Sequence, residues 1–207
     1  HPRALEAKTV ELDAHGFARP FWWYLAGTGC LAAGFADYPL IAYHFGKMDI
    51  MPSRWIPLLY ALAMGADGLA ALVLGRLYDR RGTGVLIAAV LMTVPVVPLV
   101  FLGGFTAAVT GAVLWGIGMG AQESVMKAMV AAMSPAARRG TAFGIFNMNF
   151  GVFWFLGSTL MGWLYDLSVP LLAAFSVLIQ LLSIPLLSRV TRGMPPPSAD
   201  GIADIGK

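Results

Sequence analysis

The chain has 207 residues, of which 58% are hydrophobic and only 12% are charged, and its formal net charge at pH 7 is +3. Because a soluble domain carries about 25% charged residues, most of this protein's surface must face something other than water. The small net charge gives no indication of a nucleic-acid partner. The single cysteine, Cys30, excludes an internal disulfide and a cysteine-based metal cluster, and we expect no metal or cofactor.

Six stretches of low charge are each long enough to cross a hydrocarbon layer about 30 Å thick. We therefore predict an all-α membrane protein with six transmembrane helices, roughly at residues 21–45, 55–77, 85–102, 106–133, 141–165 and 169–187. They form one bundle over residues 20–190, between a cytoplasmic linker at 1–19 and a disordered, proline-rich cytoplasmic tail at 191–207. Since the chain starts at His1 and no signal peptide precedes the first span, we expect a piece of a longer protein.

Basic residues are divided unequally between the two ends of these spans. On one side lie only Lys47 and Arg54, while Lys127 falls inside the fourth span. Positive flanks stay in the cytoplasm. Both termini are therefore predicted to be cytoplasmic, in a plasma or inner membrane, because the other side carries Arg3, Lys8, Arg19, Arg76, Arg80, Arg81, Arg138, Arg139, Arg189, Arg192 and Lys207.

A short internal repeat accompanies this topology. The pattern Gly-x-Leu-Tyr-Asp ends the second span at residues 75–79 and the fifth span at 162–166. Each copy closes the second helix of a three-helix group, and three crossings reverse the direction of the chain. We therefore predict two inverted three-helix repeats, the plan of many transporters.

Residues 75–82, Gly-Arg-Leu-Tyr-Asp-Arg-Arg-Gly, resemble the signature of the major facilitator superfamily, which lies between the second and third helices of each half. Thr83 and Gly84 stand where that signature usually has a basic pair, which favours the carboxy-terminal copy. Residues 138–144 also resemble the entry to the eleventh helix of many members. Over about residues 20–190, the chain is similar to the carboxy-terminal six-helix half of such a transporter.

The resemblance implies secondary active transport of a small solute by alternating access, driven by a proton or solute gradient. It also implies a partner, the missing amino-terminal six-helix half, and a gate motif of Gly75, Asp79, Arg80 and Gly82 in which Asp79 holds the cytoplasmic side closed. The solute, the coupling ion, the direction of coupling and the oligomeric state are left open.

Polar residues inside the spans mark the expected cavity. In the known fold, the helices that correspond to the first, second, fourth and fifth spans line the cavity. Charged groups within a membrane avoid lipid and face a cavity or a partner. The third and sixth spans carry nothing more polar than Thr93, Ser176, Gln180 and Ser183. The substrate or coupling candidates on the other four spans are Asp37, Asp67, Glu123, Lys127 and Asn147.

Asp67 lies near mid-membrane, since twelve residues of helix at about 1.5 Å each bring it there. It has no basic residue within one turn of its helix, and our hypothesis is that it is the coupling carboxylate. The alternative is a structural Asp that caps a neighbouring helix or bonds to a tyrosine. Glu123 and Lys127 are four residues apart on one helix face, either as a pair that contacts solute or as a static pair at the cytoplasmic mouth.

Asp37 lies close to Pro39, whose missing N–H loosens the helix. The exposed carbonyls beside it suit a cation or a gate, or the feature is an ordinary proline kink. His44 shares the face of Asp37 but is expected at the membrane interface, with a plain surface role. Asn147 either hydrogen-bonds the solute or belongs to a packing stripe of small residues.

Two other classes remain as alternatives to a transporter. One is a six-helix channel or a non-transporting scaffold. The other is an intramembrane aspartyl protease that uses Asp37 and Asp67, but residues 65–67 are Gly-Ala-Asp rather than part of the Gly-x-Gly-Asp of that family. We therefore predict that the protein is not an enzyme, and no nucleotide-binding signature indicates direct use of ATP.

Overall fold

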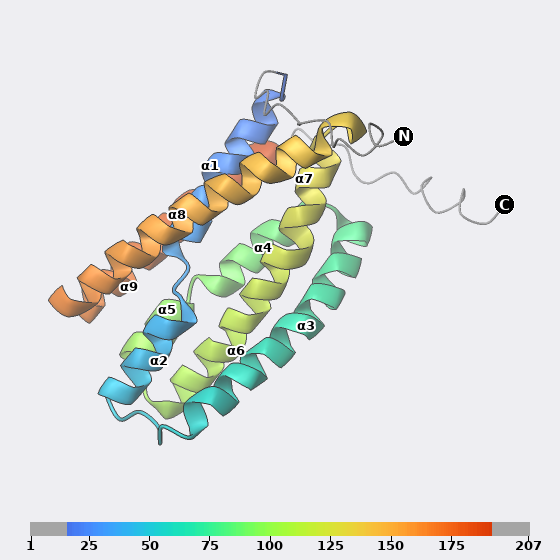
Figure 1. Ribbon diagram of the computed structural model, residues 1–207. Coiled ribbons are helices and arrows are strands. Elements are labelled where there is room, and N and C mark those ends of the chain that lie inside the picture. The colour runs from blue at the N-terminus through green and yellow to red at the C-terminus, as the bar shows by residue number, and fades with distance from the viewer. Residues whose placement is uncertain (1–15, 192–207) are drawn as a thin grey trace, which may run out of the picture.

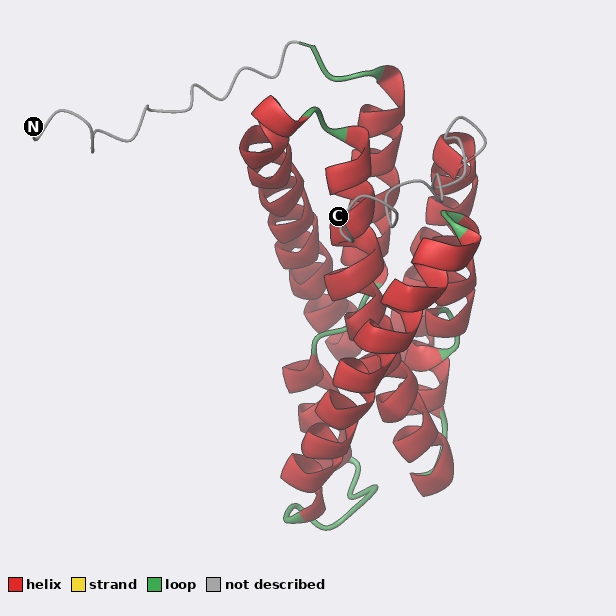
Figure 2. Cartoon of the chain, turned by 90° about the vertical axis from the view of Figure 1, so that its right-hand side faces the viewer, coloured by secondary structure: helices red, strands yellow, loops and turns green. Residues whose placement is uncertain are grey.

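The computed structural model describes residues 16–191, which are almost entirely helical and contain no strand (Figures 1 and 2). The all-α prediction is therefore confirmed for this part of the chain. Most of the predicted linker and tail lies outside the described residues. The helices, in chain order, are α1 (Arg19–Gly34), α2 (Tyr38–Lys47), α3 (Trp55–Arg81), α4 (Gly84–Thr93), α5 (Val96–Leu102), α6 (Phe105–Ala121), the π-turn η2 (Gln122–Met126), α7 (Lys127–Met133), the 3-10 turn η3 (Ala136–Arg138), α8 (Arg139–Leu167) and α9 (Val169–Thr191).

Five helical stretches in the described residues are long and apolar enough to cross a membrane. The remaining expected span, 106–133, consists of α6, η2 and α7 in direct succession. The six-helix count and the inverted repeat stay predictions. The five stretches are Arg19–Lys47, Trp55–Arg81, Gly84–Leu102, Ala136–Leu167 and Val169–Val190.

Three of the expected continuous spans are interrupted. α1 ends at Gly34 and α2 begins at Tyr38, because Pro39 suits the first turn of a helix but has no N–H with which to continue one. Pro95 lies between α4 and α5 for the same reason. The third interruption is η2, where one turn is widened by i→i+5 bonding. The expected kink in the first span is therefore a complete break over residues 35–37.

Two of the backbone carbonyls at this break are paired with side chains of other helices. Ser176 and Gln180 of α9 both donate to the Gly34 carbonyl, at 2.6 and 3.1 Å, and the Trp115 indole of α6 donates to the Ala36 carbonyl at 2.7 Å. Thr93 of α4 donates to the Gln180 side-chain oxygen at 3.1 Å. These bonds matter because an unpaired carbonyl in hydrocarbon costs several kcal/mol.

Glycines allow the helix backbones to approach closely at two interfaces. A β-carbon at Gly116 or Gly120 of α6 would overlap the α3 backbone at Ala63 or Asp67. A β-carbon at Gly157 of α8 would overlap the α1 backbone at Ala33. Close approach of this kind is how helices associate where the hydrophobic effect gives no driving force.

Burial is uneven among the spans. In their most apolar stretches, 67% of the residues of Arg19–Lys47 are buried, against 17% for α3 and 11% for the span that contains α8. Large exposed side chains therefore follow α3 and α8, including Leu69, Met148 and Phe155. α3 and α8 thus present the least covered faces of the bundle.

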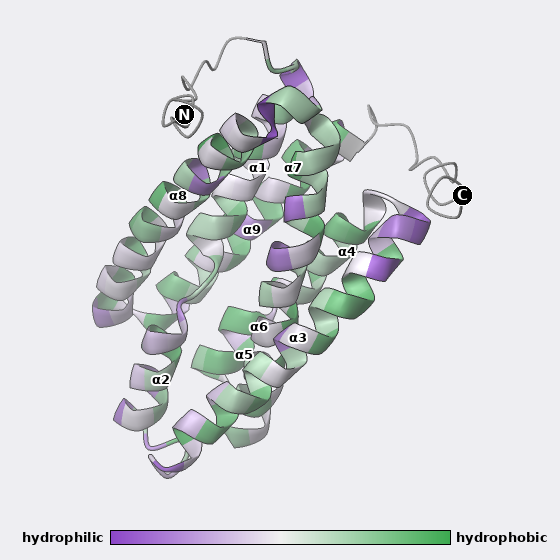
Figure 3. Cartoon of the chain, turned by 45° about the vertical axis from the view of Figure 1, so that its right-hand side comes forward, coloured by the Kyte–Doolittle hydropathy of each residue, from purple (hydrophilic) through white to green (hydrophobic). Residues whose placement is uncertain are grey.

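Hydrophilic residues gather at the two ends of the bundle and at a few points along it (Figure 3). The end where α3 finishes and α8 starts carries Arg80, Arg81 and Arg139, and Arg189 lies 4.7 Å from the Trp23 ring at the start of α1. Lys47 and Arg54 lie where α2 ends and α3 begins. The described basic residues are thus divided as the sequence indicates.

Substitution of Gly157 by Ala should lower the stability of the bundle by about 1–3 kcal/mol, because the added methyl group forces α8 away from α1. The midpoint of thermal unfolding in detergent measures this effect. Gly162→Ala is the matched control, since it lies on the same helix with open space around it. Equal midpoints for the two variants would contradict the close α1–α8 contact.

Candidate functional site

A hollow of about 420 Å³ opens beside the break between α1 and α2. Asp37 lines it from the break, and the rest of its wall comes from α8. The α8 residues are Phe150, Gly151, Trp154, Phe155, Ser158 and Thr159. The hollow therefore combines one carboxylate with a wall in which half of the α8 residues are aromatic.

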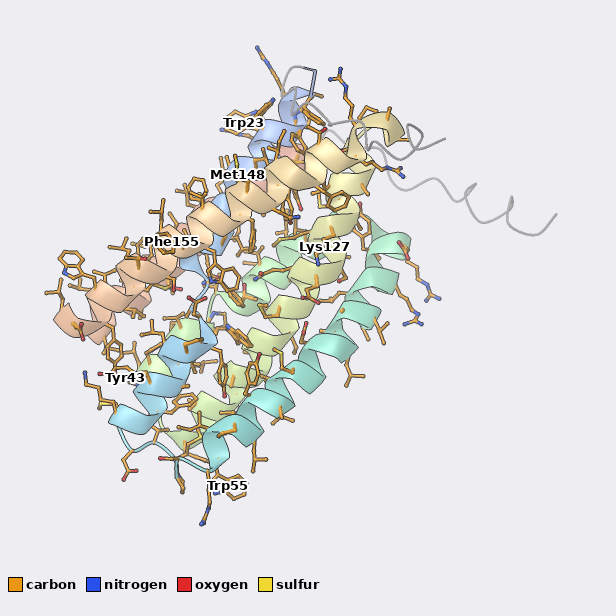
Figure 4. All side chains as sticks on the ribbon, viewed as in Figure 1. Trp23, Tyr43, Trp55, Lys127, Met148 and Phe155 are labelled. Carbon is orange, nitrogen blue, oxygen red and sulfur yellow. The ribbon has the colours of Figure 1, made fainter. Side chains whose placement is uncertain are left out.

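A second hollow of about 170 Å³ shares Phe150 and Trp154 with the first. Three of the sequence-predicted residues line it: Glu123, Lys127 and Asn147. Figure 4 shows Lys127 at the point where α7 continues the helix formed by α6 and η2, and it shows Met148 and Phe155 on α8. We call the two hollows together the α8 groove. It brings together four of the five candidate residues, Asp67 being the exception.

Asp37 is held in the groove by two neutral donors from α8. The Trp154 indole N–H donates to one carboxylate oxygen, and the Ser158 hydroxyl donates to the other. Both contacts are possible because the chain is extended at Asp37, immediately before α2 begins. Both oxygens of the Asp37 side chain therefore accept a hydrogen bond from α8.

Glu123 and Lys127 line the same hollow, but within residues 16–191 no ion pair joins them. The reason is local: Glu123 lies inside the π-turn, where residues four apart no longer stack as they do in an α-helix. The Tyr24 hydroxyl of α1 donates to the Met126 carbonyl at 2.8 Å and so supports the turn. Both charged side chains are exposed, so each remains available to a ligand.

Asp67 lies outside the α8 groove, on α3, which packs against α6 and η2. Its backbone lies against Gly120, and the charge of Glu123 acts on its carboxyl group. One carboxylate oxygen is buried without a hydrogen-bond partner in the described part of the chain. Neither a helix-capping bond nor a tyrosine partner, the structural alternatives, is present for that oxygen.

Two polar residues near the groove differ in their roles. Asn147 is exposed and lines the groove, whereas Asn149 donates to the Leu25 carbonyl at 2.9 Å and ties α8 to α1. The surface role expected for His44 is wrong, because this side chain is only 3% exposed and its Nδ1 lies 3.0 Å from the Tyr165 hydroxyl. Lys47 covers the Tyr165 ring, at 5.0 Å from its centre, so α2 is attached to the end of α8.

The four residues of the predicted gate motif lie at the end of α3. Gly82 has a φ of 70°, which requires glycine, and its N–H closes the helix on the Tyr78 carbonyl at 2.7 Å. Asp79 and Arg80 are both exposed, and Gly75 faces Ser124 of η2. Within residues 16–191 Asp79 has no hydrogen bond or ion pair, so its predicted closing role would need a partner outside this part of the chain.

An aromatic series that crosses the bundle was missed by reasoning on the sequence. Neighbouring rings lie 4.6–5.9 Å apart, and the series connects α8 to α3 through the break. Only the i, i+4 spacing of the three α8 rings is visible in the sequence. The members in order are Tyr24, Phe146, Phe150, Trp154, Phe35, Trp115, Tyr38 and Tyr60.

Comparison with known proteins decides the family. The sequence model of the Major Facilitator Superfamily matches residues 20–205. The chain belongs to this superfamily. The predicted resemblance is therefore confirmed, and the protein is a multi-pass membrane protein of a transporter family.

Uncharacterised proteins of Mycobacterium bovis and Mycobacterium tuberculosis are similar to this superfamily member. Each is 32% identical over 195 residues, a match that covers 91% of the present chain and 48% of the relative. The chain thus spans about half the length of the curated relatives it matches.

Proposed function

We propose that this chain forms one half of a secondary active transporter, which carries a small solute by alternating access and uses the α8 groove as part of its solute site. The observation that supports this most is the clustering of Asp37, Glu123, Lys127 and Asn147 on one groove, within helices that are otherwise apolar. Charged groups at membrane depth are costly and are kept where they bind or move a solute.

The other half of the cavity is supplied by a second six-helix bundle that packs on α3 and α8. Two observations support this partner. The exposed Glu123 and Lys127 would face lipid without it, and the relatives are about twice as long as this chain. Asp79 and Arg80 then lie on the cytoplasmic face, where Asp79 bonds across the two halves in the outward-open state. Both termini are cytoplasmic in this arrangement.

The rival functions are less well supported. A protease dyad needs two carboxylates in contact. Among the described residues, Asp37 is bonded to α8 and Asp67 lies beside η2, with no contact between them. A channel needs a path open to both sides at once, whereas a transporter opens to one side at a time. The accessibility of the groove from each side therefore distinguishes the two.

Alternating access predicts that the two ends of the groove are open in turn. The intact protein would carry Cys30→Ala and Asn147→Cys. A bulky thiol reagent attached to position 147 from the cytoplasmic side should act as a wedge that keeps this side open. Labelling of Ser158→Cys from outside should then slow by about fivefold or more, because the population shifts to the inward-open state. Labelling rates with an impermeant maleimide in oriented vesicles measure this.

Asp49→Cys provides the control, because it lies in the loop between α2 and α3 and should be labelled from outside at the same rate with or without the wedge. An unchanged rate at position 158 would indicate a channel. Labelling of position 49 only from the cytoplasmic side would reverse the proposed orientation.

We further propose that Asp67 couples transport to a proton or another cation, since one of its oxygens is buried without a partner and Glu123 is its charged neighbour. Asp67→Asn should abolish gradient-driven accumulation but preserve exchange at equal concentrations. Proteoliposomes of the intact protein, with a solute found by screening metabolites, provide both measurements. Accumulation by Asp67→Asn at the level of the Asp49→Asn control would show that Asp67 is structural.

A further inference from the structure

The carboxylate of Asp37 has no counter-charge within the described residues. Its two partners, Trp154 and Ser158, are neutral, and they orient the group without cancelling its charge. Lys47 lies at the far end of α2 over the rings of Tyr43 and Tyr165. At membrane depth an uncompensated charge is unfavourable. A cation in the hollow would therefore interact favourably with the Asp37 carboxylate.

The wall around Asp37 suits a cation that carries an apolar body. Phe150, Trp154 and Phe155 line the same hollow as the carboxylate, and the Phe150 and Trp154 rings lie 5.6 Å apart. Aromatic faces attract cations most strongly where water is excluded. The hollow of about 420 Å³ is the part of the binding space that this chain supplies.

The distribution of charge along the groove indicates the sign of the charge that the solute carries. At one end Glu123 and Lys127 carry opposite charges and line one hollow, so together they contribute no net charge. Asp37 at the other end is left with one negative charge. Asn147 and Ser158 are separated by eleven positions of α8, or about 16 Å at about 1.5 Å per residue, so the two ends are distinct subsites.

From these contacts we infer that the transported solute is an amphipathic organic cation. Its positive group binds Asp37, its aromatic or apolar body lies along Phe150 and Trp154, and its polar end reaches Glu123, Lys127 and Asn147. The hydrogen bonds from Trp154 and Ser158 compete with the cation for the same carboxylate. This inference rests on the proposed transport function and adds the chemical class of the solute.

Two probes of the same size and shape but opposite charge test the inference. Tetraphenylphosphonium and tetraphenylborate should be measured by equilibrium binding to the intact protein in nanodiscs, with empty nanodiscs subtracted. The wild-type protein should bind the phosphonium at least about tenfold more tightly than the borate, because opposite charges attract in a site of low dielectric. Preferred binding of the borate, or binding of neither probe, would overturn the inference without any variant.

Variants then locate the site. Asp37→Asn should weaken phosphonium binding by about tenfold or more, whereas Asp49→Asn, the same change in an exposed loop, should leave it unaltered. Ser158→Ala and Trp154→Phe should retain or strengthen binding, since each frees the carboxylate and keeps the wall. Equal binding by Asp37→Asn and Asp49→Asn would contradict the proposed role of Asp37, and so would a tenfold loss in both Ser158→Ala and Trp154→Phe.

The transport proposal and this inference fail separately. Phosphonium binding by a protein whose groove does not alternate would refute transport and keep the cation site. Alternating access in a protein that prefers tetraphenylborate would keep transport and place an anion at Lys127 instead.

Discussion

The structure depends on one constraint: a helix that is broken inside hydrocarbon must find partners for the carbonyls that the break exposes. Pro39 favours a break here, because it has no N–H with which to continue the helix and suits the first turn of a new one. The Gly34 carbonyl is then paired with Ser176 and Gln180 of α9, and the Ala36 carbonyl with Trp115 of α6. The break is thus joined to two helices that lie far apart in the sequence.

The candidate site follows from the same break. Residues 35–37 are not helical, so the Asp37 side chain can reach both Trp154 and Ser158 on α8. The second interruption, η2, has a parallel effect, because it separates Glu123 from Lys127 and leaves both in the groove. π-turns are often found at functional sites. Two local departures from the α-helix therefore place the charged groups.

Much of the fold could be predicted from composition and pattern alone. Long apolar stretches separated by charged loops indicate spans, and residues 75–82 indicate the family. Four of the five polar candidates, which lie on one groove, could be found from the sequence because a charged or polar residue within a span is itself a sign of function. What the sequence could not provide were the long-range partners: Gln180 lies 146 residues from Gly34, and the buried His44 packs on Phe101 and on Tyr165, which is 121 residues away.

The most direct test is whether Asp37 lies against Ser158, as a broken first span requires. In the intact protein with Cys30→Ala, cysteines at positions 37 and 158 should be joined by a short bifunctional thiol reagent, as judged by the mass of a peptide pair after digestion. Cysteines at 37 and 156 provide the control, because Leu156 is exposed on another face of α8. Efficient joining of 37 to 158 but not to 156 is the predicted result. Equal joining of both pairs, or of neither, would contradict the account.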